Sequence, residues 1–519
     1  MTFSFDLVGE RWVPCVTHQG DTEELSLTDA LLQAHTYREL GGESPLVTAA
    51  LYRLMLAILH RVFGPKDRDA WCDLWARGRL EPTPLLEYLS RWRHRFDLFD
   101  SERPFYQGDH PTIPSNPIGN LLHELSRDDT LYDHRTATGI GLAPAQAARH
   151  VVCAQAFGRW MTKGPYGQLP FGTCARGIVF YAKGDSLFED LVLNLIRYPS
   201  RDDVMPCDRA NDAPCWEMED PFMPARSVAF GYLDYMTWLS RRILLLPETE
   251  NGQVIVYRAK IAPGLRMTDE MRNPAMQHKD CRKRGWKSWV PFTEKRALWR
   301  DSASIMQVPH EAYDARDSHP PAIIEWLASL VVETQALTAG QTMRLAGMGM
   351  AGDLNQYRVH FHRREELPLP LAYLQEQNLV SHLQQAIGEA EDAGRQLFGA
   401  LSTLAVEMLF HKQEQRLSGP AKIERNNLIA SWGVERLYWA DLELPFHSLI
   451  TDLPHDDQPA RRAWALTVRK AAWRALDAAI AAVGEDPPAL KAAVLARGQL
   501  GGGLHKVLQH WFPREPEEV

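Results

Sequence analysis

Residues 379–408 read LVSHLQQAIGEAEDAGRQLFGALSTLAVEM, and they decide the character of the last part of this 519-residue chain. In each half of this stretch the large apolar side chains recur every three or four positions, so the side chains of each half share one face of a helix. These residues are Leu379, Leu383, Ile387, Leu397, Leu401, Leu404 and Met408. Because no proline interrupts the stretch, we predict long helical segments with one buried face.

Helical periods continue to the end of the chain. The apolar residues between Trp473 and Val483 share one face, and Gly484 with the prolines that follow ends this helix. We expect two more helices at 427–442 and 489–511. Short links between helices favour antiparallel neighbours, so the region after about residue 370 is predicted to form a bundle of four or five helices.

Strand and helix signals alternate in the region before residue 370. Residues 3–7 alternate apolar and polar side chains and are expected to form a strand, followed by a turn and a second strand at 11–16. Residues 51–62 carry the apolar face of a helix, and 144–160 are expected to hold another.

Three further signals in this region have a local physical cause. Residues 177–182 read as a strand, and Ser186 with Glu189 forms a capping box that begins a helix. Asn251-Gly252 lies between two apolar runs, which is typical of a hairpin turn. Residues 357–362 alternate again and predict another strand.

The bulk composition is that of a soluble globular protein. Apolar residues make up 45% and charged residues 24% of the chain, and no run approaches the ~20 apolar residues of a membrane span. The N-terminus has no basic segment followed by an apolar one, so we expect a cytoplasmic protein. The net charge of −9 argues against indiscriminate coating of nucleic acid.

The seven cysteines are scattered, and none forms a CxxC pair. This usage is typical of reduced thiols in a reducing compartment. No pair has the spacing of zinc ligands, so we predict no metal site and no cofactor.

Residues 279–300 contrast with the acidic background. Eight Lys or Arg accompany only two acids in this stretch, and the tryptophans Trp286, Trp289 and Trp299 are interleaved with them. Basic groups neutralise phosphates, and flat aromatic rings pack on sugars or bases. A solvated charged face over buried tryptophans explains the same spacing, and the sequence pattern alone favours neither reading.

The motifs of the common enzyme classes are absent from the sequence. There is no GxSxG, GxxxxGK[ST], HExxH or helix-opening GxGxxG. Asp133 and His134 are adjacent, but neighbouring residues of an extended segment point to opposite sides and do not form a dyad by themselves. His360 and His362 share one face of the expected strand, although two ligands make a weak metal site.

Two loops suit binding, although each alone is more often a plain turn. Residues 163–173 place several glycines beside Lys163, and glycine lets backbone N–H groups approach a ligand closely. Residues 351–358 place Asn355 and Gln356 at the entry to a strand, where amide side chains can touch base edges or fill the gap between separated bases.

The order of several blocks resembles a known family. They are FDLVGERWVPCV (5–16), FDLFDSERPFYQ (96–107), TLYDHR (130–135), ARGIVFYAKGDSLFEDLVLNLI (175–196), KRALWRDS (295–302) and HFHRREELPLP (360–370). The series is similar to the CasA family, the large subunit of Cascade, which is the type I-E CRISPR surveillance complex. The resemblance extends over essentially the whole chain, and the ordered series is more specific than any single block.

The resemblance implies an α+β fold with a mixed α/β N-terminal domain at 1–370, for recognition of DNA, and a C-terminal four-helix bundle at 371–519. It implies a protein without catalytic activity that recognises the protospacer-adjacent motif (PAM) of foreign double-stranded DNA and helps to unwind it for guide RNA pairing. Its implied partners are that DNA, the guide RNA through the other subunits, the small, backbone and guide-processing subunits, and a helicase-nuclease. No membrane is involved.

Family roles can be carried to positions of this sequence. The glutamine wedge that enters the duplex matches Asn355 and Gln356. The glycine loop near the minor groove matches the segment that contains Lys163, Gly164 and Gly167, although Pro165 and Tyr166 interrupt it. The lysine that enters the minor groove matches Lys279, with Arg282 and Lys283 as alternatives in register. The loop near the 5′ end of the guide RNA matches Leu131, Tyr132 and Asp133.

Two other functions compete with this one. A metal-dependent nuclease would use Asp133, His134, His360 and His362. A purely structural helical scaffold would show no dependence of DNA affinity on Lys279, Asn355 or Gln356.

Overall fold

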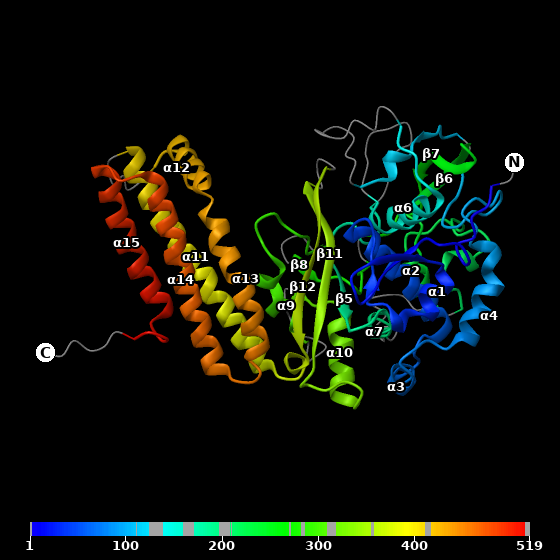
Figure 1. Cartoon of the computed structure of the whole chain (residues 1–519), viewed down its shortest axis with the longest axis horizontal. Helices are drawn as coiled ribbons and strands as arrows, with labels where there is room; N and C mark the ends of the chain where they lie inside the picture. The colour runs from blue at the N-terminus through cyan, green and yellow to red at the C-terminus, as the bar shows by residue number, and fades with distance from the viewer. Residues whose placement is uncertain are drawn as a thin grey trace. The chain divides into compact units, whose positions relative to one another are not determined.

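The computed structural model describes residues 3–110, 112–123, 139–158, 171–196, 208, 210–268, 271–281, 286–308, 318–353, 358–410 and 417–513. The chain forms two compact units (Figure 1). The first contains residues 1–298, 308–338 and 343–366, and the second contains residues 299–307, 339–342 and 367–519. The fold is α+β, with mixed helices and strands in the first unit and a helical C-terminal region, as predicted.

The strands of the described residues form four three-stranded sheets, in the orders β2-β1-β3, β4-β7-β6, β10-β8-β9 and β12-β11-β5. Their bounds are β1 Val13–Val16, β2 Thr22–Leu25, β3 Glu39–Leu40, β4 Asn116–Pro117, β5 Val179–Lys183, β6 Arg241–Glu250, β7 Gln253–Pro263, β8 His278–Cys281, β9 Trp286–Trp289, β10 Ser318–His319, β11 Thr342–Asp353 and β12 Arg358–Pro370. The helices of the first unit are α1 Leu27–Leu32, α2 Pro45–Phe63, α3 Arg68–Ala76, α4 Pro82–Trp92, α6 Pro144–Phe157, α7 Leu187–Leu193, α8 Tyr232–Met236 and α10 Ala322–Glu333.

Helix α2 is the central helix of the first unit. Ser44 caps its N-terminus by accepting a hydrogen bond from the Val47 amide, and Pro45 occupies the first turn, where no intrahelical donor is needed. The helix is long and apolar enough to cross a membrane, but 83% of its apolar window is buried inside the fold. This burial is that of a core helix, which packs against α6 and α8.

The strand predicted at 3–7 is wrong. Asp6 makes only an isolated bridge to Asp97, and a turn closes by hydrogen bonds from the Gly9 and Glu10 amides to the Asp6 carbonyl. Because this turn begins within the predicted strand, too few residues remain to form a ladder. The second predicted strand is present as β1, and its partners are β2 and β3.

The other local signals in the first unit are confirmed. Strands β6 and β7 form the predicted hairpin, and its turn residues have the positive φ angles of 50° at Asn251 and 81° at Gly252. Ser186 caps α7 by accepting a hydrogen bond from the Glu189 amide, which confirms the predicted helix start. The capping box itself forms only in part, because the Glu189 carboxylate accepts from the Asp185 amide, at 2.7 Å. Helix α6 fills most of the range predicted at 144–160.

The second unit is built from helices α9 Ser302–Met306, α11 Gln377–Phe410, α12 Gly419–Trp432, α13 Val434–Asp452, α14 Asp457–Val483 and α15 Pro487–Leu508. Helix α11 packs against α14 and α15, and α13 packs against α14 (Figure 1). The single helix predicted at 427–442 is wrong. Gly433 ends α12 in the left-handed conformation, with φ of 66°, and α13 begins directly after it.

The last residues of the basic stretch belong to the second unit. Trp299 is buried, and its ring lies 4.6 Å from Phe446 and 6.0 Å from Trp464, measured between ring centroids. The Arg300 guanidinium bonds to Glu391 at 2.7 Å and lies 3.6 Å from the centroid of the Trp439 ring. Trp299 and Arg300 therefore stabilise the second unit. For Trp299 this agrees with the hypothesis of a charged face over buried tryptophans.

A buried ionic network fixes the C-terminal end of β5. The Lys183 ammonium is fully buried, lies 3.1 Å from a carboxylate oxygen of Glu39, and also bonds to Asp190 and Tyr52. Arg364 of β12 bonds to the same Glu39 carboxylate. A buried charge is costly unless it is paired and hydrogen-bonded, so the network favours one arrangement of β3, β5, α7 and β12.

The pKa of Glu39 predicts a step in acid stability. Burial by itself raises this pKa, but Lys183, Arg38 and Arg364 outweigh burial and lower it from 4.5 to about 2. Since the folded pKa lies below the ordinary value, the stabilisation is present above about pH 4.5 and is lost as the pH falls toward 2.

We expect Glu39→Gln to reduce the free energy of unfolding at pH 7 by about 3–5 kcal/mol, because it leaves Lys183 and Arg364 without their shared carboxylate. It should also flatten the pH dependence between 4.5 and 2. Urea unfolding across this pH range measures both effects, with the exposed Glu102→Gln as control. Equal pH profiles for the two variants would contradict the role of Glu39.

Candidate nucleic-acid interface

Lys279 is the predicted DNA-contacting residue that lies within the described residues. The other predicted DNA-contacting residues lie outside the described residues: Lys163, Gly164, Gly167, Arg282, Lys283, Asn355 and Gln356. The same holds for Leu131, Tyr132 and Asp133 of the guide-RNA loop, and for Asp133 and His134 of the nuclease alternative. Their roles stay predictions. The structure does describe the strands that lead into and out of the 282–285 and 354–357 segments.

Strands β8 and β9 form an antiparallel pair that we call the basic hairpin, residues 278–289. Lys279 is exposed on β8 and is paired with Ser288 on β9 and with Ser318 on β10. The neighbouring His278 is buried: its ring lies 4.3 Å from that of Trp289, between centroids, and its Nε2 lies 3.0 Å from the Asn273 carbonyl oxygen. Alternation along β8 thus buries the histidine as an anchor and leaves the lysine at the surface.

Strands β11 and β12 are neighbours in one sheet, and we call residues 342–370 the amide hairpin, after Asn355 and Gln356 in its connecting segment. Strand β11 is paired with β5 from Met348↔Val179 to Arg344↔Lys183. The segment at 354–357 therefore follows a strand whose residues 344–348 are paired with the buried strand β5 of the first unit.

Strand β5 connects the two hairpins. On the edge away from β11, the Phe180 amide donates to the Ala275 carbonyl at 2.7 Å, and the Ile178 amide donates to the Val290 carbonyl at 3.1 Å. Val179 also bridges to Met276. Residues 275–276 precede β8 and Val290 follows β9, so the base of the basic hairpin and one strand of the amide hairpin lie on opposite edges of the same short strand.

Two glycines allow residue 177, just before β5, to lie close to β11 on one side and to Met276 and Trp289 on the other. A Cβ at Gly349 of β11 would lie 2.9 Å from the Gly177 carbonyl oxygen, and a Cβ at Gly177 would lie 3.0 Å from the Met276 sulfur and 3.3 Å from Trp289 Cβ. Because a backbone atom cannot move aside as a flexible side chain can, Gly349 has a steric reason to be glycine.

Contacts from β12 add a second connection. The His360 Nδ1 lies 3.0 Å from a carboxylate oxygen of Glu294, and the Arg363 guanidinium lies 5.6 Å from the centroid of the Phe292 ring. The segment after β9 therefore lies against the amide hairpin. The nuclease alternative would use His360, whose ring lies against Glu294. Within the described part of the chain, no three or more His, Cys, Asp or Glu side chains lie close enough together to bind a metal ion.

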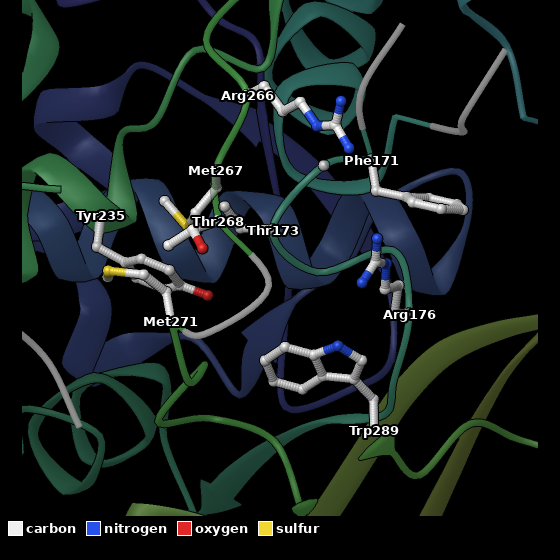
Figure 2. A pocket seen from close by; sticks show the side chains of 10 residues that line it. Phe171, Thr173, Arg176, Tyr235, Arg266, Met267, Thr268, Met271 and Trp289 are labelled. Atoms are coloured by element: carbon white, nitrogen blue, oxygen red, sulfur yellow. The ribbon is translucent and has the colours of Figure 1, made fainter. Parts of the chain in front are cut away.

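A small pocket lies where the segment after residue 170 meets β9 (Figure 2). It has a volume of about 50 Å³ and is lined by Phe171, Gly172, Thr173, Arg176, Tyr235, Arg266, Met267, Thr268, Met271 and Trp289. Of these residues the sequence pattern singled out Gly172 and Trp289. Arg176 belongs to the 175–196 block, whereas Arg266 lies in none of the quoted blocks, and only the fold places both in the lining of one pocket.

Comparison with solved structures places the fold in the class of CRISPR-associated large subunits. The crystal structure of CasA from Thermus thermophilus matches with a TM-score of 0.80 and 27% identity, over 97% of this chain and 100% of that chain. A chain of a structure described as a CRISPR RNA-guided surveillance complex matches with a TM-score of 0.74 and 20% identity, over 96% and 99% of the two chains.

Sequence comparison then shows the family. The model for CRISPR-associated protein Cse1 matches residues 6–475. The curated CRISPR-associated protein CasA/Cse1 of Thermus thermophilus is 30% identical over 510 residues, which cover 95% of this chain and 96% of the relative. The chain therefore belongs to the CasA/Cse1 family, and the resemblance seen in the sequence is confirmed.

The glycine contact predicts the effect of a single methyl group. We expect Gly349→Ala to lower the free energy of unfolding by about 1–3 kcal/mol, because the added Cβ forces β11 away from the Gly177 carbonyl. The control is Gly340→Ala, where a Cβ would meet nothing within 4 Å. Urea unfolding of both variants measures the difference, and equal stability would contradict the close approach of β11 to residue 177.

Proposed function

We propose that this chain is the large subunit of a type I-E CRISPR Cascade complex. In that complex it recognises the PAM of foreign double-stranded DNA, helps to unwind the duplex for guide RNA pairing, and offers a docking surface to a helicase-nuclease. Membership of the CasA/Cse1 family supports the assignment to Cascade. The observation that carries the DNA-binding role is the attachment of the basic and amide hairpins to opposite edges of β5.

The two hairpins suit two steps of duplex opening. Cationic side chains on the basic hairpin neutralise phosphates and reach the minor groove, whose degenerate code fits tolerance for several motifs. The amides of Asn355 and Gln356 then occupy the gap between separated base pairs. Inserting such a wedge costs a few kcal/mol of unstacking, which new contacts offset. In guided systems the protein reads the short motif and base pairing reads the remaining sequence.

The partners follow from this role. Leu131, Tyr132 and Asp133 contact the region near the 5′ end of the guide RNA, and Lys163, Gly164 and Gly167 approach the minor groove. The net charge of −9 fits local rather than general contact with nucleic acid, because backbone subunits would hold the guide. The chain acts in the cytoplasm without catalytic activity of its own, and the helicase-nuclease cuts the target.

The wedge predicts a difference between duplex and single-stranded targets. We expect Asn355→Ala with Gln356→Ala to weaken loading of the assembled complex onto duplex DNA about tenfold or more, since a few kcal/mol of unstacking is no longer offset. Loading onto a single-stranded target of the same sequence should change little. Gel-shift titration with both targets measures this, and the exposed Gln19→Ala is the control. Equal loss on the two targets would refute the wedge.

The basic hairpin predicts a change in salt dependence. We expect Arg282→Glu with Lys283→Glu to lower duplex affinity and to reduce the slope of log Kd against log salt by about 0.9 for each phosphate that the variant no longer neutralises. The exposed pair Arg11→Glu with Lys66→Glu carries the same change in net charge away from the hairpin. A slope that is unchanged, or that falls equally in the control, would leave the hairpin as ordinary surface.

The nuclease alternative is tested with the chain by itself. The purified chain is incubated with duplex and single-stranded DNA in magnesium or manganese. We expect no cleavage, whereas specific cleavage that Asp133→Ala abolishes would replace the proposal with an enzyme.

A further inference from the structure

An open cleft of about 340 Å³ lies on the first unit and is built from elements outside both hairpins. Its described lining comes from the turn after β1, the short 3₁₀-helix Ala34–Thr36, the end of α3 and the start of α7. The side chains that matter for its chemistry are those of His18, His35, Trp75, Asp185 and Glu189. Its volume falls in the range of pockets that bind ligands, about 300–1,000 Å³.

The cleft carries negative charge. Two carboxylates, those of Asp185 and Glu189, belong to its described lining, to which no Lys or Arg contributes. Glu189 accepts a hydrogen bond from the Asp185 amide at 2.7 Å. The Asp185 carboxylate and the rings of His18 and His35 form no hydrogen bond or ion pair with the residues that the structure describes. The cleft therefore offers a carboxylate that this part of the chain does not neutralise by direct contact.

The walls of the cleft are fixed by contacts that need no ligand. The Trp75 ring stacks on that of Trp71, with 5.3 Å between centroids and 13° between planes. Trp71 is fully buried, and its Nε1 donates to the Val192 carbonyl at 2.8 Å, which ties α3 to α7. The Leu187 amide donates to the Tyr37 carbonyl at 2.8 Å and ties the start of α7 to the segment after the 3₁₀-helix.

An indole ring beside carboxylates suits one kind of cation best. A cation is attracted to the face of an indole ring, and a planar guanidinium can stack on that face while it bonds two carboxylate oxygens at once. An ammonium group supplies the charge without the flat surface. Trp71 occupies one face of the Trp75 ring, so a ligand in the cleft meets the other face or the edge. The lining therefore matches a guanidinium group.

We propose that this cleft receives an arginine side chain from a partner protein. Sites for small molecules enclose about 70–90% of their ligand, whereas His18, His35 and Asp185 are exposed and leave this cleft open. An arginine on a protein surface brings a wall of its own, which completes the enclosure. The net charge of −9 favours a basic partner in the same way. The inference does not depend on the proposed contacts with DNA.

The decisive experiment uses the purified chain labelled with 5-fluorotryptophan and follows the ¹⁹F resonance of Trp75, which Trp75→Phe removes and so assigns. The probe is the peptide acetyl-Ala-Arg-Ala-amide, and its partner is the same peptide with neutral citrulline in place of arginine. We expect the arginine peptide to shift the Trp75 resonance saturably and the citrulline peptide to leave it unchanged. Asp185→Asn should weaken binding about tenfold or more, because a charge-assisted hydrogen bond is lost.

Glu189→Gln is the second variant, because its side-chain oxygen can still accept from the Asp185 amide while the charge is removed. It should weaken the arginine peptide as Asp185→Asn does. Asp73→Asn is the matched control, since this exposed acid lies on the same helix as Trp75 and does not line the cleft. Its affinity should equal that of the wild type.

Three results would overturn the proposal. The guanidinium site is refuted if the arginine peptide causes no saturable shift of Trp75, or if the citrulline peptide shifts it equally. It is also refuted if Asp73→Asn weakens binding as much as Asp185→Asn. Agmatine, a free guanidinium compound, tests the source of the cation. If agmatine binds tenfold more tightly than the peptide, the cleft serves a small molecule and not a partner protein.

Discussion

The first unit depends on the fact that both edges of β5, Val179–Lys183, are occupied. All five of its residues are buried. One edge pairs with β11, and the other receives backbone contacts from the residues that precede β8 and follow β9. Lys183 ends the strand inside the protein, where Glu39 and Asp190 balance its charge. Because the side chains of β5 are all buried, a shift of register on either edge would break hydrogen bonds or leave a buried charge unpaired.

This arrangement explains how an acidic protein can bind a duplex locally. In the proposed function, the residues at 282–283 and 355–356 lie in segments that join regular strands, and Lys279 lies on β8 itself. Those strands are anchored by backbone pairing, by Gly349 against residue 177 and by His360 against Glu294. Binding residues on loops that a rigid scaffold positions are common in proteins.

Local signals predicted the local structure well. Asn251-Gly252 predicted the β6–β7 hairpin because only a few residue types accept positive φ, and the apolar spacing at 379–408 predicted helix α11. Tertiary effects were not visible. Spacing cannot show that Trp299 packs among the helices of the second unit, or that Lys183 is buried. The predicted strand at 3–7 failed because a turn begins at Asp6, so its pairing with residue 97 stays an isolated bridge.

The common attachment of the two hairpins is tested most directly by photo-crosslinking in the assembled complex. A photoreactive residue is placed at position 283 in one preparation and at position 356 in another, and each is bound to the same motif-bearing duplex. Attachment to a shared strand predicts that both positions crosslink to the motif or to the base pairs next to it. Crosslinks to separate regions of the DNA, or from one position alone, would contradict it.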